Sequence, residues 1–213
     1  MMDKIAFVYM GGNEYKWLFF EVFDRVKRYF KDIDLGVLPV YAGKLKLPPG
    51  VVIRVKVNNG YVKMYSFEAV VEALYGKLVE MRNSVNDDSF TKIFGITTLP
   101  IGSRKEYFDI YKKYLGIQVS IGNYNVLVLS IRPFYTENRE LFVERVFKGV
   151  LHEIGHLYGL SHCNNDCVMN PPRDIEDWDR RAPSYCNSCL AELRRKLRPM
   201  PRLSHHVYEC SHC

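Results

Sequence analysis

The sequence between residues 152 and 170 reads HEIGHLYGLSHCNNDCVMN. It holds three histidines, a glutamate and two cysteines, whereas no histidine or cysteine precedes it in the chain. Imidazole, carboxylate and thiolate groups are the side chains with which proteins bind transition metals. We therefore expect this stretch to build a metal site, and we expect the rest of the fold to hold it in place.

The first part of this stretch is predicted to lie on a helix. Apolar residues recur at helical spacing from about residue 137 to residue 158 and make a wide apolar face. On such a helix His152 and His156 are four residues apart and project from the same face, so both imidazoles reach one ion. Glu153 lies on the adjoining side, where it can contact a metal-bound water without being a ligand.

A third ligand follows the helix. Gly159 can adopt the left-handed conformation that ends a helix, and the reversed chain would bring His162 to the same ion. Three neutral imidazoles and one water form the open site of a catalytic zinc, which lowers the pKa of that water to about 7. The alternative for an isolated H-E-x-x-H is a pair of hydrogen-bonded core histidines. Gly159, His162 and Met169, following at these spacings, favour the zinc site.

A second metal site is predicted from the cysteines, because thiols in a reducing setting more often bind metal than form disulfides. Four thiolates form the closed tetrahedral set of a structural zinc site. The alternative is that these cysteines are only buried thiols or redox pairs. The predicted ligands are Cys163, Cys167, Cys186 and Cys189. Because Cys163 adjoins His162, this ion would fix the loop that carries a catalytic ligand.

The remaining cysteines, Cys210 and Cys213, stand in ECSHC at the end of the sequence. His205, His206 and His212 lie nearby. These cysteines could bind a further ion, exchange with the other thiolates or stay free. We expect a flexible or accessory tail.

Residues 152–189 resemble a known family. HEIGHLYGLSH with a downstream methionine is similar to the metzincin signature, and the cysteine directly after the third histidine resembles the archaemetzincin branch. The likeness continues through C-x-x-x-C-x-M to C-x-x-C, and DWDRR at 177–181 resembles the family's segment before that last pair.

This resemblance assigns roles to the residues of the motif. It implies that His152, His156 and His162 hold the catalytic zinc, that Glu153 is general base and then general acid, and that Met169 forms the Met-turn beneath the metal. It also implies an edge strand that pairs with the substrate backbone, for which YNVLVLSIRP at 124–133 is the candidate. A plain core strand explains that apolar segment equally well.

The rest of the chain predicts one compact α/β (α+β) unit. Its 213 residues, 47% hydrophobic and 25% charged, suffice for a core. Strands are predicted at 4–10, 33–42, 50–57, 90–99 and 124–135, and helices at 14–31, 67–82, 137–158 and 188–197. With the resemblance, we expect a metzincin-like fold with a twisted mixed sheet packed against helices. Residues 1–158 would form an N-terminal subdomain that includes the active-site helix, and residues 159–213 a zinc-stapled C-terminal subdomain.

Net charge and hydropathy limit the kinds of partner that the sequence predicts. A net charge of +6 is mildly basic, and the stretch RRKLRPMPR at 194–202 could attract phosphates or acidic peptides, or form a solvated helix face. The apolar run Ile5–Met10 is too short for a signal-peptide core, and no apolar stretch is long enough to cross a bilayer. We expect a soluble, cytoplasmic monomer without membrane or nucleic-acid partners.

The function predicted from these residues is zinc-dependent peptide hydrolysis. Glu153 would activate a zinc-bound water and later protonate the leaving amine, with two Zn²⁺ per chain, one catalytic and one structural, and a peptide or protein as substrate. The alternative is a non-enzymatic zinc module that binds nucleic acid or protein through its C-x-x-C pairs and basic stretch. An open three-histidine site beside a glutamate favours the enzyme.

Overall fold

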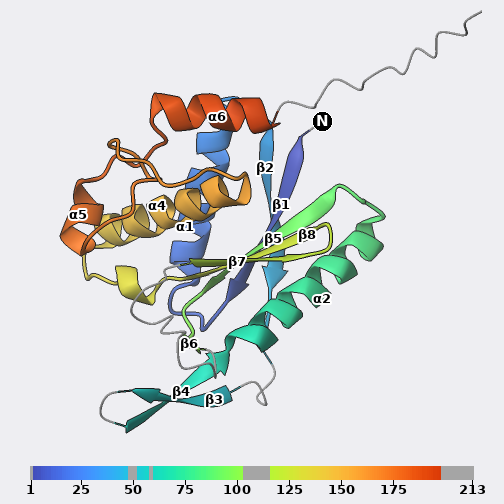
Figure 1. The fold of residues 1–213 in the computed structure, drawn as a ribbon. Helices are drawn as coiled ribbons and strands as arrows, with labels where there is room; N and C mark the ends of the chain where they lie inside the picture. Colours follow the sequence, from blue (N-terminus) through green and yellow to red (C-terminus); the bar gives the residue numbers. More distant parts are fainter. Residues whose placement is uncertain (1, 48–51, 58–59, 103–115, 198–213) are drawn as a thin grey trace, which may run out of the picture.

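The computed structural model describes residues 2–47, 52–57, 60–102 and 116–197. A five-stranded sheet forms its centre, in the order β2-β1-β5-β8-β7 (Figure 1). Its strands are β1 (Asp3–Met10), β2 (Val37–Lys44), β5 (Phe90–Thr97), β8 (Tyr124–Ser130) and β7 (Gly116–Ile121). The first four in this order run parallel, and β7 pairs antiparallel with β8 at the edge.

Helices cover both faces of this sheet. One side carries α1 (Lys16–Asp32), α4 (Arg139–Leu157), α5 (Ile175–Arg180) and α6 (Asn187–Leu197), and the other carries α2 (Phe67–Val85) (Figure 1). Alternate residues of β1 therefore enter different cores: Ile5, Phe7 and Tyr9 pack towards α1 and α4, and Ala6, Val8 and Met10 towards α2. Burial on both faces explains why β1 reads as an unbroken apolar run.

A second, small sheet lies below the main one (Figure 1). In it β3 (Val52–Val57) and β4 (Gly60–Ser66) form an antiparallel hairpin, and β4 pairs with the short β6 (Ile101–Gly102). Ser66 caps α2 by accepting a hydrogen bond from the Ala69 amide.

The predicted α/β fold is confirmed, and the structure adds elements that the sequence patterns did not indicate. The expected long strand at 124–135 is wrong in its second part, because β8 ends at Ser130 and a short 3₁₀ helix η2 (Arg132–Phe134) follows. Strands β4, β6 and β7 and helix α5 were not predicted. Cys210, Cys213 and the tail histidines lie outside the described residues.

The predicted substrate strand is also corrected. The segment at 124–133 contains β8, which lies inside the sheet between β5 and β7, so it is a core strand. Its four central residues, Val126–Leu129, are buried because both faces of β8 are covered. The edge position belongs to β7. No helix in the described part of the chain is long and apolar enough to cross a membrane.

Candidate active site

Helix α4 carries the first two histidines, and its ends are well defined. The side chain of Asn138 caps the start by accepting a hydrogen bond from the Leu141 amide at 3.1 Å. At the other end Gly159 has φ of 76°, its amide donates to the His156 carbonyl, and the Leu160 amide donates to the Gly155 carbonyl. This pair of bonds is a Schellman motif, which ends the helix and reverses the chain.

The reversal brings the three histidines together. His156 Nε2 lies 3.0 Å from His152 Nε2 and 3.2 Å from His162 Nε2. In a tetrahedral zinc site with Zn–N bonds of about 2.0–2.1 Å, neighbouring ligand nitrogens are separated by about 3.3 Å. The three nitrogens are therefore spaced as ligands of one ion would be.

The other ring nitrogens determine the tautomers. His152 Nδ1 lies 2.6 Å from the Val168 carbonyl oxygen, and His156 Nδ1 lies 2.9 Å from the Leu160 carbonyl oxygen. A carbonyl oxygen only accepts, so each Nδ1 donates and each Nε2 of the neutral ring keeps its lone pair. Burial lowers the pKa of His152 to about 4 and lowers that of His156, which keeps both rings neutral. Converging lone pairs repel each other unless a cation lies between them, so these residues fit a bound metal ion.

Glu153 lies beside the histidines on α4 with its side chain buried. Burial raises the pKa of its carboxyl group to about 7, and among the described residues none hydrogen-bonds this carboxyl group. The carboxyl packs against Gly116, the first residue of β7, where an added Cβ would overlap it. The glutamate is thus held between helix α4, which carries His152 and His156, and the edge strand.

Met169, the predicted Met-turn residue, packs against the helix that carries His152 and His156. The side chain is fully buried, and a Cβ at Gly155 on α4 would overlap its sulfur. The Cys163 amide donates to the Met169 carbonyl at 3.1 Å, and the preceding carbonyl, that of Val168, binds the His152 ring. This turn therefore supports both the helix and the loop that carries His162.

The four predicted cysteines gather next to this turn. The Sγ atoms of Cys163, Cys167, Cys186 and Cys189 all lie within 4.8 Å of one another, and all four thiols are free. Backbone amides of Met169 and Cys186 donate to Cys167 Sγ at 3.4 and 3.2 Å. Amide donors to sulfur are typical of sites that hold thiolates, so this group could hold a metal ion.

The pKa values of these thiols diverge. Burial raises the pKa of Cys167 to about 11 and raises that of Cys189 further. Burial also acts against the ionised form of Cys186, but hydrogen bonds from Ser188, the Cys189 amide and Asn165 outweigh it and lower that pKa to about 6. Four adjacent thiolates repel one another, so a divalent cation is needed to keep them all ionised.

Helix α5 is clamped to α4 by two buried cations. Lys148 Nζ donates to the carbonyls of Trp178, Asp179 and Arg181 at 2.9, 3.1 and 2.8 Å. Arg145 forms a bidentate ion pair with Asp179, with both N···O distances 2.6 Å. Trp178, held in this way, packs edge-on against the His152 ring with centroids 6.2 Å apart.

The structure thus brings together every residue of the predicted histidine and cysteine groups. The sequence patterns did not reveal Gly116, Gly155, Lys148 or Arg145. Gly155, fourteen residues before Met169, was the only local signal in the sequence for its contact with Met169. Gly116 gave no signal, because its partner Glu153 is distant in sequence. The described part of the basic stretch serves the fold: Arg194 donates to the Ile33 carbonyl and Lys196 to the Gly159 carbonyl.

Comparison with known proteins shows the family to which this chain belongs. The family model described as peptidase family M54 matches residues 2–195. The chain belongs to peptidase family M54. This match includes the central sheet, α4, the histidines and the four clustered cysteines of this M54 protein.

Among its curated relatives is the archaemetzincin of Archaeoglobus fulgidus, 39% identical over 89 residues, which are 40% of this chain and 55% of the relative. That of Saccharolobus solfataricus is 31% identical over 124 residues, 56% of this chain and 64% of the relative. The matched segments span about half the length of these curated relatives.

Solved structures show the same fold. The archaemetzincin of Methanopyrus kandleri has a TM-score of 0.67 at 24% identity and covers 93% of this chain and 97% of its own. A zinc-dependent peptidase from Methanocorpusculum labreanum has a TM-score of 0.59 at 19% identity, covering 89% and 99%. At these identities the likeness establishes the fold of this M54 chain and no more.

Proposed function

We propose that this protein is a zinc-dependent peptidase whose catalytic ion is held by Nε2 of His152, His156 and His162. The convergence of these three nitrogens beside a buried carboxyl group carries the proposal. A zinc ion bound there would supply Lewis acidity, which polarises a carbonyl group and makes a water molecule more acidic.

Glu153 is the proton carrier in this proposal. Its Oε atoms face no protein donor in the described part of the chain, so they are free to accept a proton from the attacking water. The same carboxyl group then delivers that proton to the amine nitrogen that leaves. Burial raises the pKa of this carboxyl group to about 7, and a zinc ion bound nearby would lower it again, which favours the carboxylate that accepts the proton.

The edge strand β7 is the proposed substrate strand. It pairs with β8 on one side, and no strand of the described chain pairs with its other edge. An extended peptide could add antiparallel to β7, and Gly116 would then place the peptide backbone close to Glu153. Addition of a strand to β7 would recognise the substrate through hydrogen bonds to its backbone and not through its side chains. We therefore assign peptides and unfolded protein segments as the substrate class.

A second zinc ion is proposed among the four cysteine sulfurs. Four thiolates close the tetrahedron, so this ion has a structural role. It joins the loop after His162 to the start of α6, because Cys186 and Cys189 flank that helix start. The loop that carries His162 would therefore depend on this ion for its position.

The decisive variant is Glu153→Ala, with Glu137→Ala as the matched control, since Glu137 is an exposed glutamate just before α4. We expect Glu153→Ala to keep two zinc ions per chain and to lose at least about a hundredfold in hydrolysis of unfolded casein. Hydrolysis at the wild-type rate by Glu153→Ala would overturn the proposed role of Glu153.

A further inference from the structure

A second candidate site follows from the order of the strands. From β1 the chain passes through α1 to β2 on one side, and the next strands of the main sheet, β5 and β8, lie on the other side of β1. The helices that precede β2 and β5 cover opposite faces of the sheet. At such a switch point the loops after the neighbouring strands diverge and leave a crevice at their carboxyl ends, where α/β proteins bind ligands.

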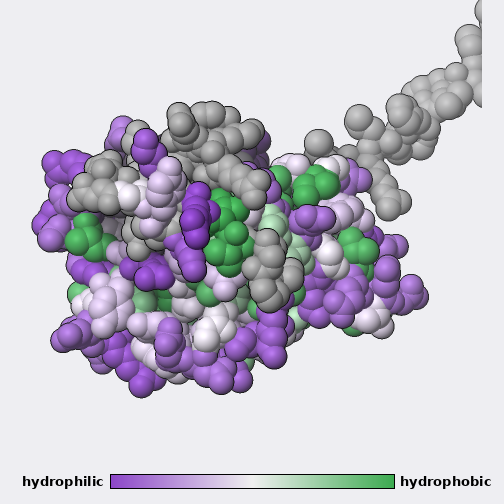
Figure 2. Space-filling view, turned by 90° about the horizontal axis from the view of Figure 1, so that it is seen from below, coloured by the Kyte–Doolittle hydropathy of each residue, from purple (hydrophilic) through white to green (hydrophobic). Residues whose placement is uncertain are grey.

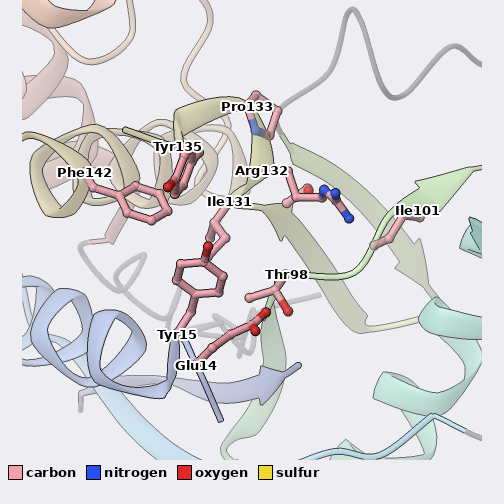
Figure 3. Close-up of a pocket in the computed structure, with 10 residues that line it drawn as sticks. Glu14, Tyr15, Thr98, Ile101, Ile131, Arg132, Pro133, Tyr135 and Phe142 are labelled. Atoms are coloured by element: carbon pink, nitrogen blue, oxygen red, sulfur yellow. The ribbon is translucent and has the colours of Figure 1, made fainter. Parts of the chain in front are cut away.

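A cavity of about 420 Å³ lies at this crevice (Figure 3). Each of the three strand ends contributes to it: Glu14 and Tyr15 follow β1, Thr98 follows β5, and Arg132 follows β8. The volume falls within the range of about 300–1,000 Å³ typical of small-molecule sites. None of the histidines or cysteines described above lines it, so it is distinct from the candidate active site.

The strand ends that form this cavity are held together. The Thr98 amide donates to the Met10 carbonyl at 3.2 Å, and the Ile131 amide donates to the Thr97 carbonyl at 3.0 Å. Gly11 lies so close to Thr98 that a Cβ would overlap its hydroxyl group. The ends of β1, β5 and β8, from which the lining loops start, are therefore fixed relative to one another.

One wall is aromatic. Buried Phe142 at the start of α4 contacts Tyr15 and Tyr135 edge-on, with ring centroids 5.9 and 5.7 Å away (Figure 3). In Figure 2, seen from the end where the parallel strands finish, hydrophobic side chains gather near the middle of this face among hydrophilic ones. Such a wall suits an apolar or aromatic group of a ligand.

Two opposite charges line the same cavity without neutralising each other. Glu14 enters from the β1–α1 loop and Arg132 from η2, which is the other side of the cavity in Figure 3. Neither side chain forms an ion pair or hydrogen bond with any other described residue. A ligand with one negative and one positive group would satisfy both, whereas a polyphosphate would be repelled by Glu14.

We propose that this cavity binds a zwitterionic α-amino acid or dipeptide with an apolar or aromatic side chain. Arg132 binds the carboxylate, Glu14 binds the ammonium group, and the side chain packs against Tyr15, Tyr135 and Phe142. The site operates whether or not the three-histidine site hydrolyses peptides, since it shares no residue with it.

Calorimetric titration of the full, zinc-loaded chain tests this proposal with L-phenylalanine, L-leucine and L-leucyl-L-phenylalanine. We expect binding of at least one of these probes. 2-Phenylethylamine and 3-phenylpropionate, each of which lacks one charge, should bind about tenfold more weakly than L-phenylalanine. Arg132→Ala should weaken L-phenylalanine about tenfold and leave 2-phenylethylamine unchanged, and Glu14→Gln should leave 3-phenylpropionate unchanged.

Matched control variants test whether the probes bind in this cavity and not elsewhere on the protein. Arg54→Ala and Glu72→Gln remove exposed charges elsewhere and should leave every affinity unchanged. Weaker binding of L-phenylalanine by Arg132→Ala also distinguishes this cavity from product binding at the histidines, which would leave that affinity unchanged. Two results would overturn the proposal: no heat from any probe up to about 10 mM, or equal affinity for L-phenylalanine in the wild type and Arg132→Ala with unchanged thermal unfolding.

Discussion

Replacing Lys148 by methionine should destabilise the protein strongly, because this lysine is fully buried on α4 and holds α5 in place. Its Nζ donates to three carbonyls at the end of α5 and pairs with Glu144 at 2.9 Å. Methionine keeps most of the apolar stem but removes every donor. A buried carbonyl left without a partner costs about 1–3 kcal/mol, and removing one partner of a buried ion pair costs about 3–5 kcal/mol.

Because Glu144 is partly exposed and regains water, we expect a loss of about 3–5 kcal/mol in the free energy of unfolding. In a protein of this size that corresponds to roughly 6–20 °C in Tm. Urea unfolding of the zinc-loaded protein, followed by far-ultraviolet circular dichroism, measures the free energy directly.

Arg139→Ala is the matched control on the same helix. Arg139 pairs with Glu21, but the two side chains are 66% and 45% exposed, so the change should stay within about 0.5 kcal/mol. A Lys148→Met variant within about 1 kcal/mol of the wild type would mean that the three carbonyls find other donors without cost and that Lys148 does not hold α5 in place.

Three further predictions concern the candidate site. Gly116→Ala should displace the Glu153 carboxyl and reduce peptide hydrolysis at least about tenfold at unchanged zinc content, since the new Cβ overlaps that group; initial rates and metal analysis measure both. Cys189→Ser should lower the zinc content from two ions to one and destabilise the fold, because structural zinc contributes directly to folding. With the three-histidine site emptied by mild chelation, Glu153 should titrate near pH 7. Its raised folded-state pKa stabilises the fold below pH 4.5, and roughly 3 kcal/mol should be lost as pH rises through 7, relative to Glu153→Gln.

These three predictions have their own controls. Gly76→Ala on α2, where a Cβ meets nothing, should leave hydrolysis unchanged. Full activity of Gly116→Ala would mean that Glu153 tolerates displacement. Retention of two zinc ions by Cys189→Ser would remove this cysteine from the ligand set. If wild type and Glu153→Gln showed parallel unfolding curves between pH 4.5 and pH 7, burial would not control this carboxyl.

Much of the fold was predictable from local pattern. The unbroken apolar runs of β1 and β8 indicate strands covered on both faces, and α4 shows helical spacing along its whole length. The grouping of three histidines was also predictable, because it needs only one helical turn and a glycine reversal. The helical turn and the glycine that ends it are both visible within a few residues of the sequence.

Features that depend on distant contacts were not predictable in this way. Strand β7 is partly buried along nearly its whole length, and it lies at the edge of the sheet because β8, its only strand partner in the described chain, pairs with β5 on the other side. A lysine in a helix predicts a solvated face, yet Lys148 is buried because the carbonyls of α5, thirty residues later, surround its ammonium group. The cavity at the switch point likewise combines three loops that are far apart in sequence.

Anomalous X-ray scattering at the zinc absorption edge would locate both proposed ions in a crystal of the zinc-loaded protein. We expect two separate peaks per chain, one about 2.0–2.1 Å from Nε2 of His152, His156 and His162, and one among the four cysteine sulfurs. The histidine-bound ion should have no fourth protein ligand. A missing peak at the histidines, or a side chain completing that tetrahedron, would rule out an open catalytic zinc at these three residues.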